Sequence, residues 1–166
     1  AEAQYYLGLL YSSGQGVTTD PVEALTWTQA AAENGHTEAQ FELSRAYAEG
    51  IGTQVDSARA LLWLQQAAEA GHGEAQYSLA YALDSGRGIA RDRAAGLNWL
   101  LRAAEGGFLR AQVVLGKKYL RGDGVTANPQ EAQRWLGLGV KAGDLEATVT
   151  LGLALLVRYH RDLQNS

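Results

Sequence analysis

Residues 2–37 read EAQYYLGLLYSSGQGVTTDPVEALTWTQAAAENGHT, and residues 38–73 read EAQFELSRAYAEGIGTQVDSARALLWLQQAAEAGHG. These two stretches align without a gap over 36 residues, and the pattern returns in residues 74–109, in 110–145 and in part in 146–166. Each complete stretch holds one tryptophan: Trp27, Trp63, Trp99 and Trp135. A fixed period of this length is the signature of a repeat architecture, so the sequence predicts one structural unit written several times.

Each unit contains two segments of helical length. In the first, Ala3, Leu7 and Leu10 follow the spacing of one helix face. The second is expected to begin at Asp20, whose side chain can accept from free N–H groups, with Glu23 completing a capping box. No stretch shows the sustained alternation of a half-buried strand, so the sequence predicts an all-α fold.

Glycines separate the helical segments. Gly35 and its equivalents follow the second segment, where a left-handed residue commonly ends a helix. A pair of glycines follows the first segment in each unit: Gly14 and Gly16, Gly50 and Gly52, Gly86 and Gly88, Gly122 and Gly124.

An isolated helix pair cannot bury its apolar faces, so neighbouring pairs are predicted to stack into a solenoid. Small residues are expected wherever helices nearly touch, and two columns fit: Gly8, Ser44, Ala80, Gly116 and Gly152, and Ala31, Ala67, Ala103 and Gly139. The tryptophans are predicted to be core residues of the second helix, packed against the next helix.

The motifs of the first unit closely resemble the Sel1-like repeat, which is related to the tetratricopeptide repeat. They are Glu2 to Gly8, Tyr11, Gly14 to Val17, Asp20, Ala24, Trp27, Ala31, Ala32, Gly35 and His36. The resemblance extends from residue 2 to about residue 157. It implies one domain over 1–166, a right-handed α/α superhelix of four helix-turn-helix units (2–37, 38–73, 74–109 and 110–145) with a partial unit at 146–166.

The fifth unit departs from the pattern, because Arg158 and His160 stand where the glycine pair would be. The helix is therefore expected to continue toward Leu163 without a second helix beside it. An uncovered apolar face in this C-terminal helix is expected to associate with something.

Composition excludes several classes of function. The 166 residues carry a net charge of −4 and no cysteine, which argues against a nucleic-acid surface and excludes thiolate metal sites and cysteine nucleophiles. No apolar run is long enough to span a membrane. No metal-binding, phosphate-binding or catalytic motif is present, so we expect no enzyme activity and no cofactor. Without a methionine even at position 1, we expect a processed chain or a piece of a longer protein.

Positions that vary between units are candidates for recognition. Three variable columns lie three and four residues apart on the first helix, which puts them on one face. Stacking would align these faces into a ribbon, and the family resemblance places the first helix on the concave wall. The predicted partner-binding residues are Tyr6, Leu9, Glu42, Arg45, Glu49, Ser78, Tyr81, Val114, Lys117 and Arg121. The ribbon is expected to be rich in tyrosine and leucine at its start and basic at its end.

The resemblance implies a non-enzymatic scaffold or adaptor that binds a protein or peptide along this face. We expect a bacterial periplasmic or envelope-associated module, such as an effector-neutralising immunity protein or a secretion-assembly scaffold. The alternative is an accessory recruitment domain of a larger enzyme or signalling protein.

Overall fold

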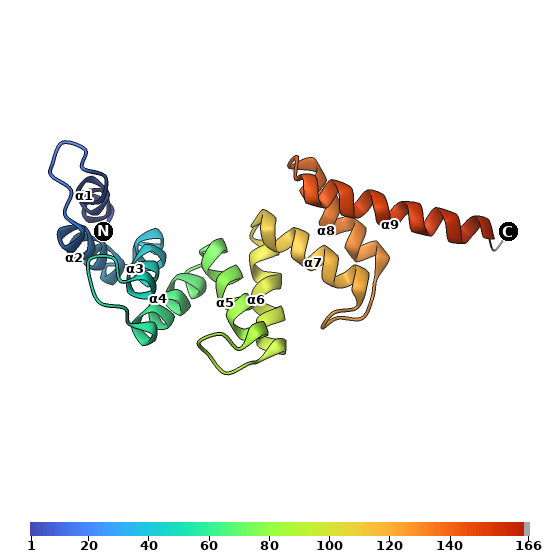
Figure 1. Cartoon of the computed structure of the whole chain (residues 1–166), viewed down its shortest axis with the longest axis horizontal. Helices are drawn as coiled ribbons and strands as arrows, with labels where there is room; N and C mark the ends of the chain where they lie inside the picture. The colour runs from blue at the N-terminus through green and yellow to red at the C-terminus, as the bar shows by residue number, and fades with distance from the viewer. Residues whose placement is uncertain (165–166) are drawn as a thin grey trace.

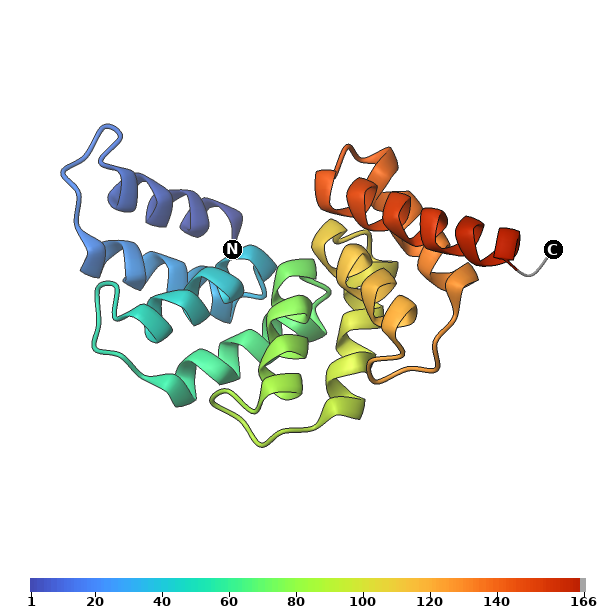
Figure 2. The same ribbon diagram turned by 45° about the vertical axis from the view of Figure 1, so that its right-hand side comes forward.

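The structure is a computed structural model that describes residues 1–164, which form nine α-helices and no strand. Figures 1 and 2 show them as consecutive antiparallel pairs, with one helix unpaired at the C-terminus. The helices are α1 (Glu2–Ser13), α2 (Pro21–Glu33), α3 (Thr37–Glu49), α4 (Ser57–Glu69), α5 (Gly73–Ser85), α6 (Arg93–Glu105), α7 (Leu109–Arg121), α8 (Pro129–Lys141) and α9 (Leu145–Gln164). The odd-numbered helices are the first helices of the units, and α2, α4, α6 and α8 are the second.

The even helices begin where the capping residues predict. The Asp20 side chain accepts from the backbone N–H of Val22 at 3.0 Å and of Glu23 at 3.1 Å. The expected capping box does not form, because the backbone N–H of Asp20 instead donates to the Tyr11 carbonyl at 3.0 Å. The same bond recurs from Asp56 to the Tyr47 carbonyl at 2.8 Å, and it ties the start of each even helix to the end of the odd helix before it.

Glycine is required at both breaks. Gly35 has φ +80°, and the next backbone N–H, of His36, donates to the Ala31 carbonyl, as in a Schellman motif. Gly52 has φ +69°, and a Cβ there would lie 2.1 Å from the Pro21 carbonyl oxygen. The loop after α3 therefore lies directly against the start of α2, where no side chain fits.

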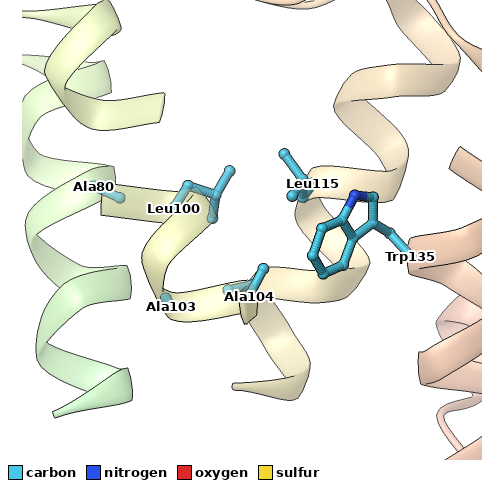
Figure 3. Close-up of a cluster of buried hydrophobic side chains, with 7 residues drawn as sticks. Ala80, Leu100, Ala103, Ala104, Leu115 and Trp135 are labelled. Atoms are coloured by element: carbon cyan, nitrogen blue, oxygen red, sulfur yellow. The ribbon is translucent and has the colours of Figure 1, made fainter. Parts of the chain in front are cut away.

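The core is a series of clusters between successive pairs. Figure 3 shows one of them, in which Leu100 and Ala104 of α6 and Leu115 of α7 meet Trp135 of α8. Trp135 is only 4% exposed. Trp135 is thus a core residue, whereas Trp27, Trp63 and Trp99 are only partly buried. The predicted direction is wrong for Trp135, because its indole packs against α6 and α7, which precede its helix.

Both small-residue columns lie at close helix contacts. A Cβ on Gly8 would be 2.7 Å from Thr28 Oγ1, and a Cβ on Gly139 would be 2.6 Å from Ala147 Cβ. Gly152 is the exception, since it is exposed and nothing lies within 4 Å of an added Cβ. The column loses its packing role in α9 because no even helix follows among the described residues.

A glutamine in each odd helix connects neighbouring units. The side-chain amide of Gln76 donates to the Ala68 carbonyl at the end of α4, at 3.0 Å. Gln40 and Gln112 make the equivalent bonds to the ends of α2 and α6, at 3.3 and 3.0 Å. Each of these carbonyls also accepts from the backbone N–H of the glycine after its helix, for example Ala68 from Gly71 at 3.1 Å, so the glutamine is a second donor that connects the two units. Gln4 accepts from Asn34 at 3.0 Å instead, since no described helix precedes α1.

The last helix continues to Gln164, as predicted, and leaves an apolar face uncovered. Leu153 (59%), Leu155 (45%) and Val157 (69%) are exposed on this face, and Leu156 (58%) is exposed on the other side of the helix. Leu155 occupies the position that Tyr47 and Leu83 fill in the second and third units, where an even helix buries the side chain. Of the helices that the structure describes, none has both the length and the apolar character needed to cross a bilayer.

Candidate concave binding surface

Neighbouring odd helices contact each other through their side chains, although an even helix lies between them in the sequence. In Figure 2 the helices follow an open arc, with α4 and α6 toward its outer edge. Within the described chain, the ion pairs that cross between units join odd helices, Asp84 to Lys118 at 3.3 Å and Lys117 to Glu146, and Glu38 of α3 contacts His72, the residue that caps α5, at 3.1 Å. Helices on the inner side of an arc approach most closely, so these contacts identify the odd helices as its inner wall.

Ring contacts follow the same wall. Tyr5 of α1 stacks on His36, with ring centroids 4.4 Å apart, and Phe41 of α3 stacks on His72 at 4.5 Å. Each histidine also caps the next odd helix, since His72 Nδ1 accepts from the backbone N–H of Ala75 at 3.1 Å. Both histidines are thus structural, as their duplication suggests. Burial, followed by the charges of Glu38 and Glu42, raises the pKa of Tyr5.

Two pockets open among the helices of units 1 and 3. The unit-1 pocket has a volume of about 100 Å³ and is lined by Tyr5, Gly8, Leu9, Ser12, Pro21, Ala24, Leu25, Thr28, Glu42, Ala46 and Ile51. The unit-3 pocket has a volume of about 60 Å³ and is lined by Tyr77, Ala80, Tyr81, Asp84, Arg93, Gly96, Leu97, Leu100, Val114, Lys118, Asp123 and Gly124.

A wider C-terminal groove lies between α7, α8 and the uncovered face of α9. Its volume is about 760 Å³, and its lining residues are Lys117, Leu120, Arg121, Pro129, Gln130, Gln133, Thr150, Leu151, Leu153, Ala154, Leu155, Val157 and Arg158. The groove is wide because none of the described helices packs on this side of α9.

The structure distributes the predicted partner-binding residues among these features. Six of them line a pocket or the groove: Leu9 and Glu42 in unit 1, Tyr81 and Val114 in unit 3, and Lys117 and Arg121 in the C-terminal groove. The other four line none of the three: Tyr6, Arg45, Glu49 and Ser78. Tyr6 is 57% exposed and stands beside Tyr5, with ring centroids 6.2 Å apart.

Charges along the wall largely compensate one another. Arg45 contacts Glu42 at 3.2 Å and Glu49 at 3.8 Å, which puts all three side chains on one face of α3. Lys117 pairs with Glu146, so much of the predicted basic end is neutralised. Arg121 is exposed and makes no ion pair with the residues whose side chains are described. Exposed pairs of this kind contribute about 0–1 kcal/mol each.

Sequence reasoning missed the two pockets, the ring stacks and the glutamine bonds. The glutamine column Gln4, Gln40, Gln76 and Gln112 was visible as an invariant polar position within a helical face. The pockets gave no such signal, because each depends on side chains from three helices. Across the described residues, no group of three or more histidine, aspartate or glutamate side chains could hold a metal ion.

The profile of the Sel1 repeat matches residues 1–36, 37–72, 73–108 and 109–144. A Sel1 repeat protein from Oxalobacter formigenes shares 36% identity over 92% of this chain, with a TM-score of 0.87. The protective antigen c5321 of uropathogenic Escherichia coli shares 36% identity over 90% of this chain, with a TM-score of 0.81. The match covers 44% and 32% of those two proteins.

The immunity protein Pa5087 from Pseudomonas aeruginosa shares 24% identity over 88% of this chain and 54% of its own, with a TM-score of 0.54. At that identity the likeness is one of fold alone. The comparison with curated proteins gave no match.

Proposed function

The chain belongs to the Sel1 repeat family, and from this premise we propose that it is a non-enzymatic scaffold that holds a protein partner along its odd helices. Sel1 repeat proteins are protein-interaction scaffolds. The observation that supports this surface is that each odd helix carries both buried residues that hold the stack and exposed residues that are free to bind a partner. Residues such as Leu43 and Leu79 are fully buried and hold the stack, whereas Tyr6 and Tyr81, at variable positions, are more than half exposed.

Exposed tyrosines make effective anchors for a protein partner. Their rings bury a large apolar area on binding while the hydroxyl group keeps a polar partner, and few torsions are fixed. The wall is also built from packed helices with matched ion pairs, so binding requires little rearrangement of the scaffold.

The specific role that we propose is a bacterial envelope-associated module that either neutralises a secreted effector or organises a secretion assembly. Its support is the 36% identity to a protein described as a protective antigen of uropathogenic Escherichia coli. The likeness to Pa5087 adds the shared fold only, so effector neutralisation has to be tested directly.

Affinity capture from the native organism, followed by quantitative mass spectrometry, tests the proposal. Proteins retained by the wild type should be lost with the double variant Tyr6→Ala/Tyr81→Ala. They should remain with Leu62→Ala/Asn98→Ala, which changes exposed positions on the even helices α4 and α6. Circular dichroism must show the same helicity for all three proteins.

The identity of the captured protein separates the two roles. A secreted toxin whose activity is blocked by the chain would support neutralisation, and a component of a secretion apparatus would support assembly. Capture abolished by the even-helix variant but not by the tyrosine variant would contradict the proposed surface.

A further inference from the structure

The unit-1 and unit-3 pockets are the same feature two repeats apart. Every residue position that lines the unit-1 pocket, moved by 72, lines the unit-3 pocket. Gly8 thus corresponds to Ala80, Leu9 to Tyr81 and Glu42 to Val114. The side chains differ at most of these positions, yet a pocket forms in both units, so the pocket follows from the backbone arrangement of α1–α3 and α5–α7.

Small residues at the helix crossings provide the space. In unit 3, a Cβ on Gly96 would lie 3.0 Å from the Ala80 carbonyl oxygen, so α5 and α6 approach without side chains between them. In unit 1 the glycine lies on the other helix, Gly8 of α1, opposite Ala24 of α2. The larger side chains to either side then form walls around a recess rather than filling it.

The walls of the unit-3 pocket favour an apolar ligand. Its interior is formed by Leu97, Leu100 and Val114. The charged groups at its rim are already paired: Asp84 contacts Lys118 at 3.3 Å and Arg93 at 3.7 Å, and Lys118 also contacts Asp123 at 3.2 Å. A charged ligand group would have to break these pairs, whereas an apolar group leaves them intact.

The unit-1 pocket has the same preference through different residues. Its one charged lining residue, Glu42, pairs with Arg45 at 3.2 Å, and the remaining polar side chains, Tyr5, Ser12 and Thr28, are neutral. A large, exposed side chain that is mostly apolar stands at the edge of each pocket, at the equivalent position of the repeat. Leu9 is 40% exposed and Tyr81 is 58% exposed. These edges would become buried when a ligand side chain enters.

The volume of each pocket limits the size of the ligand side chain that can enter it. A cavity needs roughly 10–15 Å³ for each water-sized group that it holds. The unit-3 pocket, at about 60 Å³, therefore has room for about four to six heavy atoms, and the unit-1 pocket, at about 100 Å³, for somewhat more. A branched aliphatic side chain such as leucine or isoleucine has four carbons and fits both.

We propose that the two pockets are paired anchor sites for branched aliphatic side chains of one uncharged polypeptide segment of the partner. This inference rests on the proposed function, since it specifies which part of a bound protein the odd helices hold. Packed helices have axes about 8–10 Å apart, so the pockets lie on the order of 20–40 Å from each other. An extended segment advances about 3.3 Å per residue, which separates its two anchors by roughly 6–12 residues.

Disulfide tethering tests the pockets without knowledge of the partner. The chain has no cysteine, so Leu9→Cys, Tyr81→Cys and the outward control Leu62→Cys each carry a single thiol. Each variant is equilibrated with mixed disulfides of acylated cysteamine, bearing an isovaleryl, an acetyl or a negatively charged succinyl group, in a series of mercaptoethanol concentrations. Intact-mass spectrometry then gives the modified fraction.

At positions 9 and 81, the mercaptoethanol concentration that removes half of the isovaleryl adduct should be about tenfold higher than the concentration that removes half of the acetyl adduct. The reason is that the branched carbons of the isovaleryl group are buried there. At position 62 the three adducts should be equal. Val114→Phe should abolish the preference at position 81 and leave position 9 unchanged, and Ala46→Phe should do the reverse. Each pocket thereby serves as the folding control for the other.

Equal stability of the isovaleryl and acetyl adducts at both positions, or a preference for succinyl, would overturn the proposal. Protection of position 81 that increases with protein concentration would place a second copy of the chain in the pocket, and would overturn it as well. Loss of capture by the tyrosine variant together with unselective tethering would leave the proposed function standing and remove only the anchor sites.

Discussion

Replacing Trp135 by alanine should destabilise the chain more than the same change at Trp27. Trp135 is 4% exposed because α6 and α7 cover it, whereas the equivalent Trp27 belongs to the first helix pair and is half-buried. A buried tryptophan removes about 150–250 Å² from water, and about 25 cal/mol per Å² gives about 4–6 kcal/mol as an upper value. Measured changes of this type cost about 3–5 kcal/mol.

We therefore expect Trp135→Ala to lower the free energy of unfolding by about 3–5 kcal/mol and Trp27→Ala by about 2–3 kcal/mol. Trp135→Phe should cost about 1 kcal/mol, because the phenyl ring keeps most of the apolar area and Nε1 of Trp135 is buried without a hydrogen bond to any described residue. Urea unfolding followed by circular dichroism at 222 nm measures all three.

Hydrogen exchange shows where the stability is lost. In a stack of units that contact only their neighbours, Trp135→Ala should raise amide exchange in α6, α7 and α8 while α1 to α3 keep their protection. The reasoning is refuted if Trp27→Ala costs as much as Trp135→Ala, or if exchange increases evenly along the whole chain.

Three further outcomes follow from the packing. Gly139→Ala should lower stability by about 1–3 kcal/mol in urea unfolding, since its Cβ would lie 2.6 Å from a Cβ of α9, while Gly137→Ala, with nothing within 4 Å, should be neutral or slightly stabilising. Gln76→Ala should cost about 0.5–1.5 kcal/mol by removing a buried hydrogen bond between α5 and the end of α4, and Gln4→Ala close to nothing; equal costs would contradict the role of the glutamine column. Leu153→Glu should reduce concentration-dependent self-association in analytical ultracentrifugation, because this 59% exposed leucine lies on the uncovered face of α9.

The 36-residue period predicted the helical units because local signals repeat in every unit. Asp20 caps a helix and Gly35 ends one through contacts within a few residues, so each was visible in the sequence. Gly8 and Gly139 were recognised as close-contact positions because a small residue returns at the same place in each unit.

The direction of packing could not be read from the period. A repeat spacing shows that Trp135 faces a neighbouring unit, but it is the same whether that unit precedes or follows. The predicted capping box failed for a related reason, because the loop returns Asp20 to the Tyr11 carbonyl of another helix. The basic end of the ribbon was overstated, since Lys117 meets Glu146 from a helix 29 residues further along the chain.

Site-specific photocrosslinking in the native organism tests the central claim most directly. A photoreactive phenylalanine derivative is placed at position 81, on the inner wall, and in a separate variant at position 62, on the outer face of α4. The account predicts a discrete protein adduct from position 81 and none from position 62. An adduct formed only from position 62, or equally from both, would contradict recognition along the odd helices.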